Sequence, residues 1–88
     1  MKLKISEDLR TICRKILNEN KSSKEWAQIE SGDMFQLGRL TGGFDATEEE
    51  FCFELIMDGN EYWFQFSLEE AREIAEDGNP ELEIRLAD

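Results

Sequence analysis

Hydrophobic residues near the start of the chain recur with the period of an α-helix. They follow Ser6, whose hydroxyl can cap a helix N-terminus, and two acids that suit the positive end of a helix. Their spacing of i, i+3, i+4, i+7 and i+8 places them on one face. The buried face is therefore predicted to consist of Leu9, Ile12, Cys13, Ile16 and Leu17. We expect the bases of this helix to lie mostly on its other side or in its closing turn: Arg10, Arg14, Lys15 and Lys21.

Two further helices are predicted from capping boxes, in which a serine is followed three residues later by glutamate. Ser22 with Glu25 predicts a short helix through residues 26 and 29, stopped by Gly32. Ser67 with Glu70 predicts another, ended by Gly78. The apolar face of this later helix consists of Leu68, Ala71, Ile74 and Ala75.

Elsewhere the hydrophobic pattern alternates with a period of two, as in strands. Alternation predicts strands over residues 33–41, 51–57, 61–66 and 82–86. The first of these strands ends at residue 41 because Gly42-Gly43 interrupts the alternation. Asp58-Gly59-Asn60 is typical of a tight hairpin. We favour a turn at Asp58-Gly59, because the alternative sets Asp58 against Glu61.

The order of elements is helix, helix, three strands, helix, strand. Helices segregated from hairpin-connected strands indicate an α+β fold with a mainly antiparallel sheet of about four strands, two N-terminal helices and one helix before the last strand. At 88 residues, with 40% hydrophobic and 35% charged side chains, residues 1–88 are predicted to form a single domain.

Charge is distributed unevenly along the chain. Residues 1–44 carry eight bases and six acids, a net charge of +2, whereas residues 45–88 carry fifteen acids and two bases, a net charge of −13. Internal pairing of early bases with late acids explains part of this asymmetry. It leaves several late acids facing water or a partner, and the total of −11 makes nucleic acid and anionic membranes poor partners.

The two cysteines, Cys13 and Cys52, are expected to be free thiols in a cytoplasmic protein, because no secretory signal precedes them. We place Cys13 in the core and Cys52 in a partly exposed position. Without histidine, the commonest nucleophilic triads and zinc sites are disfavoured. No catalytic, cofactor-binding or metal-binding residue is assigned, and the sequence does not indicate an enzyme.

The residues Asp45, Glu48, Glu49 and Glu50 form an acidic loop that lacks the ligand spacing of an EF-hand. A solvated loop, a partner-binding loop and a hydrolase centred on these carboxylates all remain open.

The second face of the predicted hairpin mixes large apolar side chains with carboxylates. If the aromatic rows face the core, Glu54, Ile56, Glu61 and Trp63 lie on the opposite side. One interpretation is that another helix, such as the one with Trp26, covers Trp63 and Ile56. The other is an exposed aromatic anchor ringed by acids, as expected where a surface meets a basic protein.

We therefore expect a small acidic binding module that occludes a basic surface on a partner protein, such as a nuclease or another toxin. Trp63 and Ile56 would be the anchors, with Glu54, Glu61 and the loop of Asp45, Glu48, Glu49 and Glu50 pairing with cations. Bacterial immunity proteins and phage inhibitors have this size and acidity, which is an analogy of class without a shared motif. The alternatives are a homodimer that buries the same face and a carboxylate or metal-assisted hydrolase.

Overall fold

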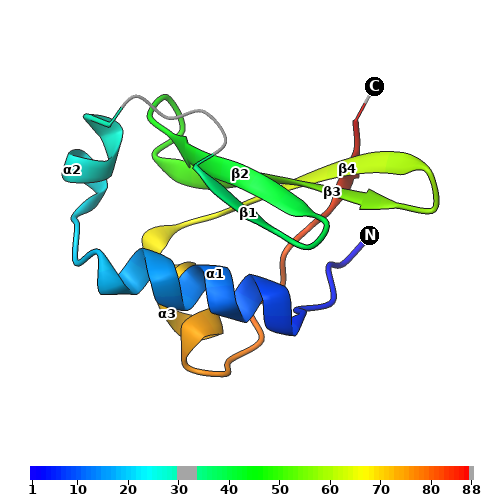
Figure 1. Ribbon diagram of the computed structural model, residues 1–88, viewed down its shortest axis with the longest axis horizontal. Helices are drawn as coiled ribbons and strands as arrows, with labels where there is room; N and C mark the ends of the chain where they lie inside the picture. Colours follow the sequence, from blue (N-terminus) through cyan, green and yellow to red (C-terminus); the bar gives the residue numbers. More distant parts are fainter. Residues whose placement is uncertain (30–33, 88) are drawn as a thin grey trace.

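The computed structural model describes residues 1–29 and 34–87. It consists of an antiparallel sheet with two helices, α1 and α3, packed against one of its faces and a short helix, α2, at one end (Figure 1). The helices are α1 (Glu7–Asn18), α2 (Ser23–Ala27) and α3 (Leu68–Ala75). The strands are β1 (Phe35–Leu37), β2 (Leu40–Asp45), β3 (Glu50–Met57), β4 (Asn60–Phe66) and β5 (Arg85–Leu86).

The sheet has five strands in the order β1-β2-β3-β4-β5, and every neighbouring pair is antiparallel. This confirms the predicted α+β class, with one strand more than expected. The additional strand arises because the predicted strand over residues 33–41 is in fact parts of two strands, β1 and β2, joined by a turn at Gly38-Arg39. The predicted start of that strand, Asp33, lies outside the described residues.

Gly42 and Gly43 do not break a strand as predicted but lie inside β2. A Cβ atom on Gly42 would come within 2.3 Å of the Cys52 carbonyl oxygen and 2.6 Å of the Phe53 ring. Glycine is needed here because the chain runs close to its neighbour. The turn instead uses Gly38, whose φ of +59° suits a tight hairpin.

The predicted hairpin between β3 and β4 is confirmed in the favoured register. Met57 pairs with Asn60, which leaves Asp58 and Gly59 as the two turn residues, and both have positive φ (51° and 80°). Such a turn matches the twist of the flanking strands.

The helix caps are also confirmed. Ser6 accepts a hydrogen bond from the Leu9 N–H, and complete capping boxes open α2 at Ser22 and α3 at Ser67. Helix α2 is shorter than predicted, because it ends at Ala27 rather than continuing to residue 29. The predicted stop signal, Gly32, lies outside the described residues.

Arg10 is an exception to the expectation that the bases of α1 avoid the core. Its side chain is buried, and its guanidinium donates to the carbonyl oxygens of Ile74 (3.0 Å) and Gly78 (2.8 Å) and to Oδ1 of Asn79 (2.8 Å). The last carbonyls of a helix lack partners within it. Arg10 therefore caps the end of α3 and joins it to α1.

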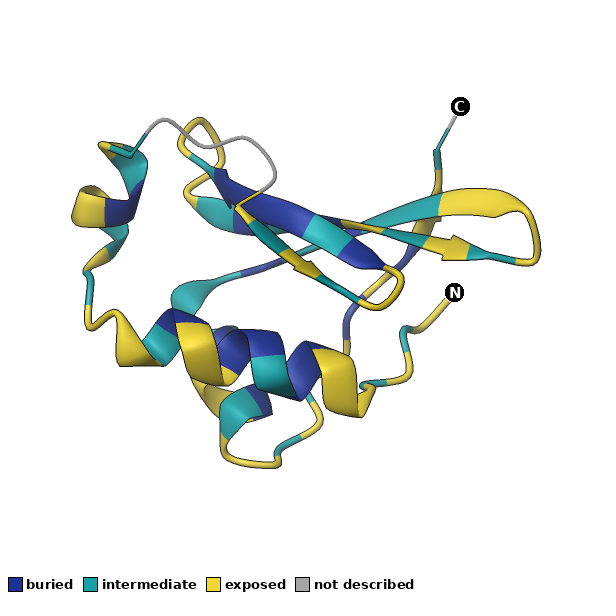
Figure 2. Cartoon of the chain, in the orientation of Figure 1, coloured by how far each residue is buried: buried dark blue, intermediate teal, exposed yellow. Residues whose placement is uncertain are grey.

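The core lies between the helices and the inner face of the sheet, where buried residues concentrate (Figure 2). The buried stripe of α1 is confirmed for Leu9, Ile12, Cys13 and Ile16, and Leu17 is partly buried. The opposing sheet face consists largely of phenylalanine rings: Phe44, Phe51, Phe53, Phe64 and Phe66. Trp26 closes one end of this layer, with its ring edge-on to Phe51 at a centroid distance of 5.4 Å.

The two ends of the described chain lie beside each other. The Leu3 N–H donates to the Leu82 carbonyl (2.7 Å) and the Ile84 N–H donates to the Met1 carbonyl (2.8 Å), so residues 1–3 extend the paired segment that leads into β5. Among the described residues, no helix is both long and apolar enough to cross a membrane.

Candidate protein-binding face

The strand side chains that point away from the helices form a second surface of the sheet, which we call the outer face. No described helix lies over it, since α1 and α3 both pack on the opposite side (Figure 1). The antiparallel registers place Glu54 beside both Thr41 and Trp63, and Trp63 beside Arg85. Alternation along each strand then assigns to this face Gln36, Thr41, Gly43, Asp45, Glu50, Cys52, Glu54, Ile56, Glu61, Trp63, Gln65 and Arg85.

The interpretation in which the helix of Trp26 covers Trp63 and Ile56 is wrong. Trp26 is buried against Phe35 and Phe51, on the inner face of the sheet. Trp63 lies on the outer face and is partly buried, and Ile56 is 52% exposed. The two indoles of the chain thus lie on opposite faces of one sheet.

The predicted anchors and their neighbouring acids are adjacent in the structure. Trp63 of β4 lies directly across from Glu54 of β3, and Ile56 of β3 lies across from Glu61 of β4. Both glutamates are exposed. Side chains directly opposite on antiparallel strands are within contact range, so each apolar group has a carboxylate beside it.

The acidic loop joins the same face from the far end of β3. Asp45 pairs with Glu50, and both point outward, while Glu48 and Glu49 are exposed in the turn between them. The Asp45 carboxylate accepts from the backbone N–H groups of Thr47 (2.9 Å) and Glu48 (3.3 Å), which fixes this turn. Glu50 and Ile56 are six residues apart along one strand, about 20 Å. The predicted residues therefore share a face, with the loop acids at one end, Ile56 and Glu61 at the other, and Trp63 with Glu54 between them.

The carboxylates of the outer face have no ion-pair partner within residues 1–29 and 34–87. The ion pairs in that part of the chain use acids elsewhere: Glu7, Glu19, Asp77, Glu81 and Glu83. Internal pairing thus occurs between the early bases and the helical and C-terminal acids, and it leaves the outer face negative.

Cys52 is affected by this negative charge. It is a free, partly buried thiol on the outer face, between Gly43 and Gln65. Burial raises its pKa above the usual 9.0, and the charges of Asp45 and Glu54 raise the pKa further. Asp45 of β2 and Glu54 of β3 therefore both contribute negative potential at the Cys52 thiol.

Sequence reasoning missed the role of Arg85. It lies on the outer face, with its guanidinium carbon 5.0 Å from the centroid of the Trp63 ring. Pairing of β5 with β4 creates this contact, and a pattern of hydrophobic residues does not specify strand order. Arg39, at the turn between β1 and β2, borders a shallow depression at the same end of the sheet as Ile56 and Asp58.

No group of three or more His, Cys, Asp or Glu side chains in the described part of the chain is arranged to hold a metal ion. Cys13 is buried in the core as predicted, and burial raises its pKa to about 12. A thiol in that state is not a nucleophile.

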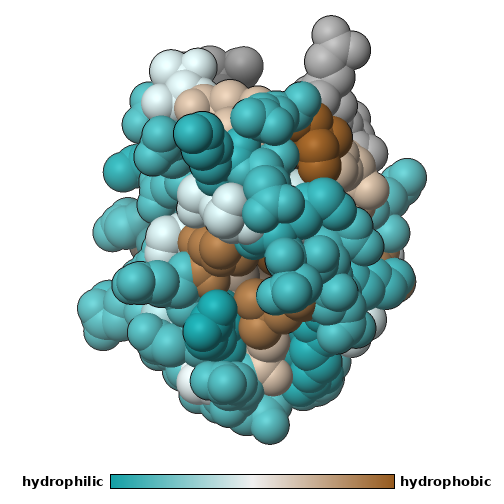
Figure 3. Space-filling view, turned by 90° about the vertical axis from the view of Figure 1, so that its left-hand side faces the viewer, coloured by the Kyte–Doolittle hydropathy of each residue, from teal (hydrophilic) through white to brown (hydrophobic). Residues whose placement is uncertain are grey.

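The end of the molecule that carries α2 offers a different surface. It is mostly hydrophilic, and its hydrophobic side chains appear as small patches between polar ones (Figure 3). A depression there is lined by Ser23, Leu68, Glu69 and Arg72, which combine one acid with one base. Unlike the outer face, this depression has no excess of one charge sign.

No protein-family model matches the chain, and no curated protein or solved structure matches it either. The geometry and charge of the outer face are the properties of this chain that bear most directly on its function.

Proposed function

We propose that this chain is a small acidic binding protein that covers a basic surface of another protein, in the manner of an inhibitor or immunity protein. The observation that carries the proposal is the outer face, where Trp63 and Ile56 lie among carboxylates that make no ion pair within residues 1–29 and 34–87, and where no described helix covers them. Covering such a surface requires no catalytic step.

The carboxylates supply attraction and orientation. Complementary charge raises association rates above those of neutral surfaces, and its effect falls as salt increases. Asp45, Glu50, Glu54 and Glu61 extend over the sheet, with Arg85 as the one base among its outward-pointing strand positions. A partner with a row of lysines or arginines is the matching surface.

The apolar anchors supply affinity. Interface energy concentrates in a few large side chains near the centre, and tryptophan is enriched among them. Trp63 lies on β4, between the acidic turn at one end of the sheet and Glu61 at the other. Ile56 adds exposed aliphatic surface on the neighbouring strand.

A nuclease or another toxin that acts on nucleic acid is a suitable partner. Such proteins hold phosphates with clustered Lys and Arg side chains, and carboxylates can occupy the same sites. The proposed location for this interaction is the cytoplasm.

The charge of the outer face argues against the homodimer alternative. A twofold interface places the same patch of each copy against the other. Asp45, Glu50, Glu54 and Glu61 would then face a second set of acids, which is destabilising. The metal-assisted form of the hydrolase alternative has no arrangement of three metal-ligating side chains within residues 1–29 and 34–87 to support it.

The test is affinity capture from the source cell with charge-reversed variants. The chain, Glu54→Lys/Glu61→Lys and a control, Glu69→Lys/Glu73→Lys, are each immobilised at low salt. The control reverses two exposed acids on α3 and leaves the outer face unchanged. We expect the unmodified chain and the control to retain a basic protein that the outer-face variant loses.

Purified partner then provides the quantitative measurement. Association rates should fall as salt rises, and Glu54→Lys/Glu61→Lys should lower the rate at least tenfold more than the control does. Failure to retain any basic protein at low salt, or equal retention by all three chains, would rule out the outer face as the binding surface. Light scattering that shows a stable dimer would favour the homodimer instead.

A further inference from the structure

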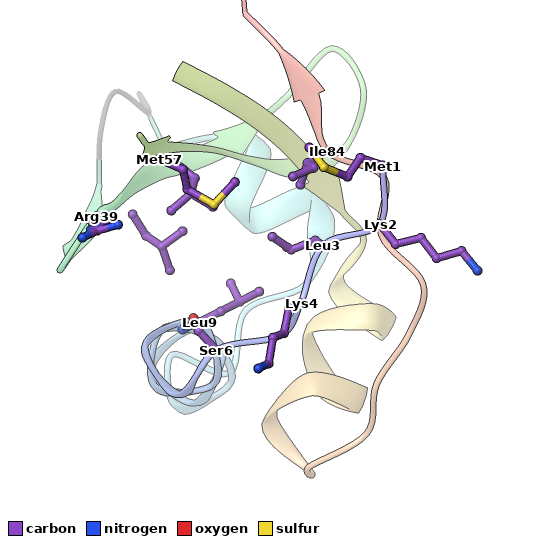
Figure 4. A pocket seen from close by; sticks show the side chains of 11 residues that line it. Met1, Lys2, Leu3, Lys4, Ser6, Leu9, Arg39, Met57 and Ile84 are labelled. Atoms are coloured by element: carbon purple, nitrogen blue, oxygen red, sulfur yellow. Dashed lines mark hydrogen bonds between the residues drawn. The ribbon is translucent and has the colours of Figure 1, made fainter. Parts of the chain in front are cut away.

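A second site lies on the other side of the sheet, where the helical layer does not reach the ends of β2 and β3. A pocket of about 310 Å³ opens there between the N-terminal segment, the start of α1 and the inner face of the sheet (Figure 4). This volume is at the small end of the range for ligand sites in proteins. It suits a small ligand rather than a folded partner.

The pocket exists because of how the N-terminal segment is held. Residues 1–3 hydrogen-bond to residues 82–84 and not to β2 or β3, and α1 begins only at Glu7. The inner side chains of the sheet at this end therefore have open space beside them. The apolar wall consists of Leu3, Leu9, Leu40, Leu55, Met57 and Ile84.

The rim of this apolar pocket is basic. Lys4 lies at the edge formed by the N-terminal segment and Arg39 at the edge formed by the β1–β2 turn, with the apolar side chains between them (Figure 4). Both are exposed, and neither makes an ion pair within the described residues. Lys2 differs, because it points away from the pocket and pairs with Glu81 at 2.8 Å.

Two unpaired bases beside an apolar pocket are notable in a chain with a net charge of −11. We propose that the pocket binds a medium-chain aliphatic carboxylate, with the chain against Leu55 and Met57 and the carboxylate at the rim near Lys4 and Arg39. Burial of each methylene of the chain adds hydrophobic stabilisation. The cations supply the polar contact that fixes the orientation of the ligand.

Two acids near Arg39 oppose this arrangement: Asp8, and Asp58, which borders the depression beside Arg39. Asp8 lies against Gly38, since a Cβ atom added there would come within 2.4 Å of its carboxylate oxygen, and Gly38 precedes Arg39 in the turn. Its charge weakens attraction of an anion to Arg39. Asp8→Asn should therefore tighten binding of the carboxylate, which is a result that a purely apolar pocket would not give.

The proposal can be tested by titration calorimetry with two ligands of equal chain length, decanoate and decyltrimethylammonium, below their micelle concentrations. The overall charge of the protein favours the cation, so preference for the anion requires a local basic site. We expect decanoate to bind at least tenfold more tightly. Lys4→Gln/Arg39→Gln should remove this preference, whereas Lys15→Gln/Lys24→Gln, which deletes two exposed bases elsewhere, should preserve it.

A second variant tests the apolar wall. Leu55→Phe places a larger side chain in the pocket and should weaken both ligands, with the fold checked by circular dichroism. Absence of decanoate binding at millimolar concentration would overturn the proposal. So would equal binding of the two ligands, or decanoate binding that survives the rim variant. Arg39 also borders the depression beside Ile56, but none of the proposed anchors and acids of the outer face lines this pocket, so failure here leaves the capture experiment on the outer face unaffected.

Discussion

Arg85 lies over the indole ring of Trp63, with its guanidinium carbon 5.0 Å from the ring centroid. The one base among the outward-pointing strand positions is therefore placed on the side chain proposed as the central anchor. Cation–π contacts at exposed sites contribute about 0.5–1 kcal/mol. Such a contact is weak enough for a partner to displace.

Replacing Arg85 by glutamine should expose the indole ring of Trp63 with only a small loss in the free energy of unfolding. We expect the free energy of unfolding in urea to fall by about 1 kcal/mol or less. Acrylamide should quench the tryptophan fluorescence more strongly in Arg85→Gln than in the original chain, because the variant exposes the Trp63 ring. Trp26 is buried, so its fluorescence does not contribute to the change in quenching. Unchanged quenching would mean that Arg85 does not shield Trp63.

The two tryptophans should differ sharply in their effect on stability. Trp26 is 1% exposed and packs against Phe51, so Trp26→Ala should cost about 3–5 kcal/mol. Trp63→Ala removes cross-strand and cation–π contacts and should cost about 1–2 kcal/mol. Urea denaturation of both variants measures this difference. A cost for Trp63→Ala as large as that for Trp26→Ala would make Trp63 a core residue.

Arg10 should be a structural residue despite its charge. Arg10→Ala removes the guanidinium donor from the Gly78 carbonyl oxygen and leaves the Ile74 carbonyl oxygen with the Asp77 N–H alone, and hydrogen bonds from charged groups are worth about 1.5–3 kcal/mol each. We expect a loss of about 3 kcal/mol in the free energy of unfolding. The control is Arg14→Ala, on the same helix, whose ion pair with Asp77 and long hydrogen bond to the Ala75 carbonyl (3.3 Å) are both exposed and together worth about 1 kcal/mol or less. Equal losses for the two variants would contradict the capping role.

The pKa of the Cys52 thiol depends on the negative charge of the outer face. Burial, Asp45 and Glu54 all raise the pKa of its thiol above 9.0, so its thiolate forms at higher pH than that of an ordinary cysteine. The rate of alkylation by iodoacetamide should therefore rise with pH to a midpoint above 9.0. Glu54→Gln removes one negative charge and should move this midpoint to lower pH, whereas Glu73→Gln on α3 should not. Cys13 should stay unmodified while the protein is folded, since it is buried.

Much of the fold could be predicted because local signals agree with tertiary contacts. The caps at Ser6, Ser22 and Ser67 and the turn at Asp58-Gly59 all satisfy backbone geometry within a few residues, so the sequence alone indicates them. The split into β1 and β2 was missed because the alternation of Phe35 and Leu37 continues through Gly38, and the strand was ended too early because a glycine pair usually marks a break. Gly42 instead accommodates Phe53, which belongs to a different strand.

The candidate site could be predicted in part for the same reason. Period-two alternation places Glu54, Ile56, Glu61 and Trp63 on one face of the hairpin whatever surrounds it. Whether a helix covers that face depends on long-range packing, as does the contact between Trp63 and Arg85. The uncovered outer face and the contact between Trp63 and Arg85 both follow from the tertiary arrangement and from the order of the strands. The basic-rimmed pocket was also missed, because Lys4, Arg39 and Leu55 come from three distant parts of the chain.

The outer face can be tested most directly by nuclear magnetic resonance, using ¹⁵N-labelled protein and the captured basic partner. The two indole N–H signals report the two faces of the sheet, since Trp63 lies on the outer one and Trp26 on the inner one. We predict that adding the partner shifts or broadens the Trp63 indole signal and the β3–β4 amides, and leaves the Trp26 signal and those of α1 and α3 in place. Changes confined to Trp26, α1 and α3, with Trp63 unaffected, would contradict the proposal that the outer face binds the partner.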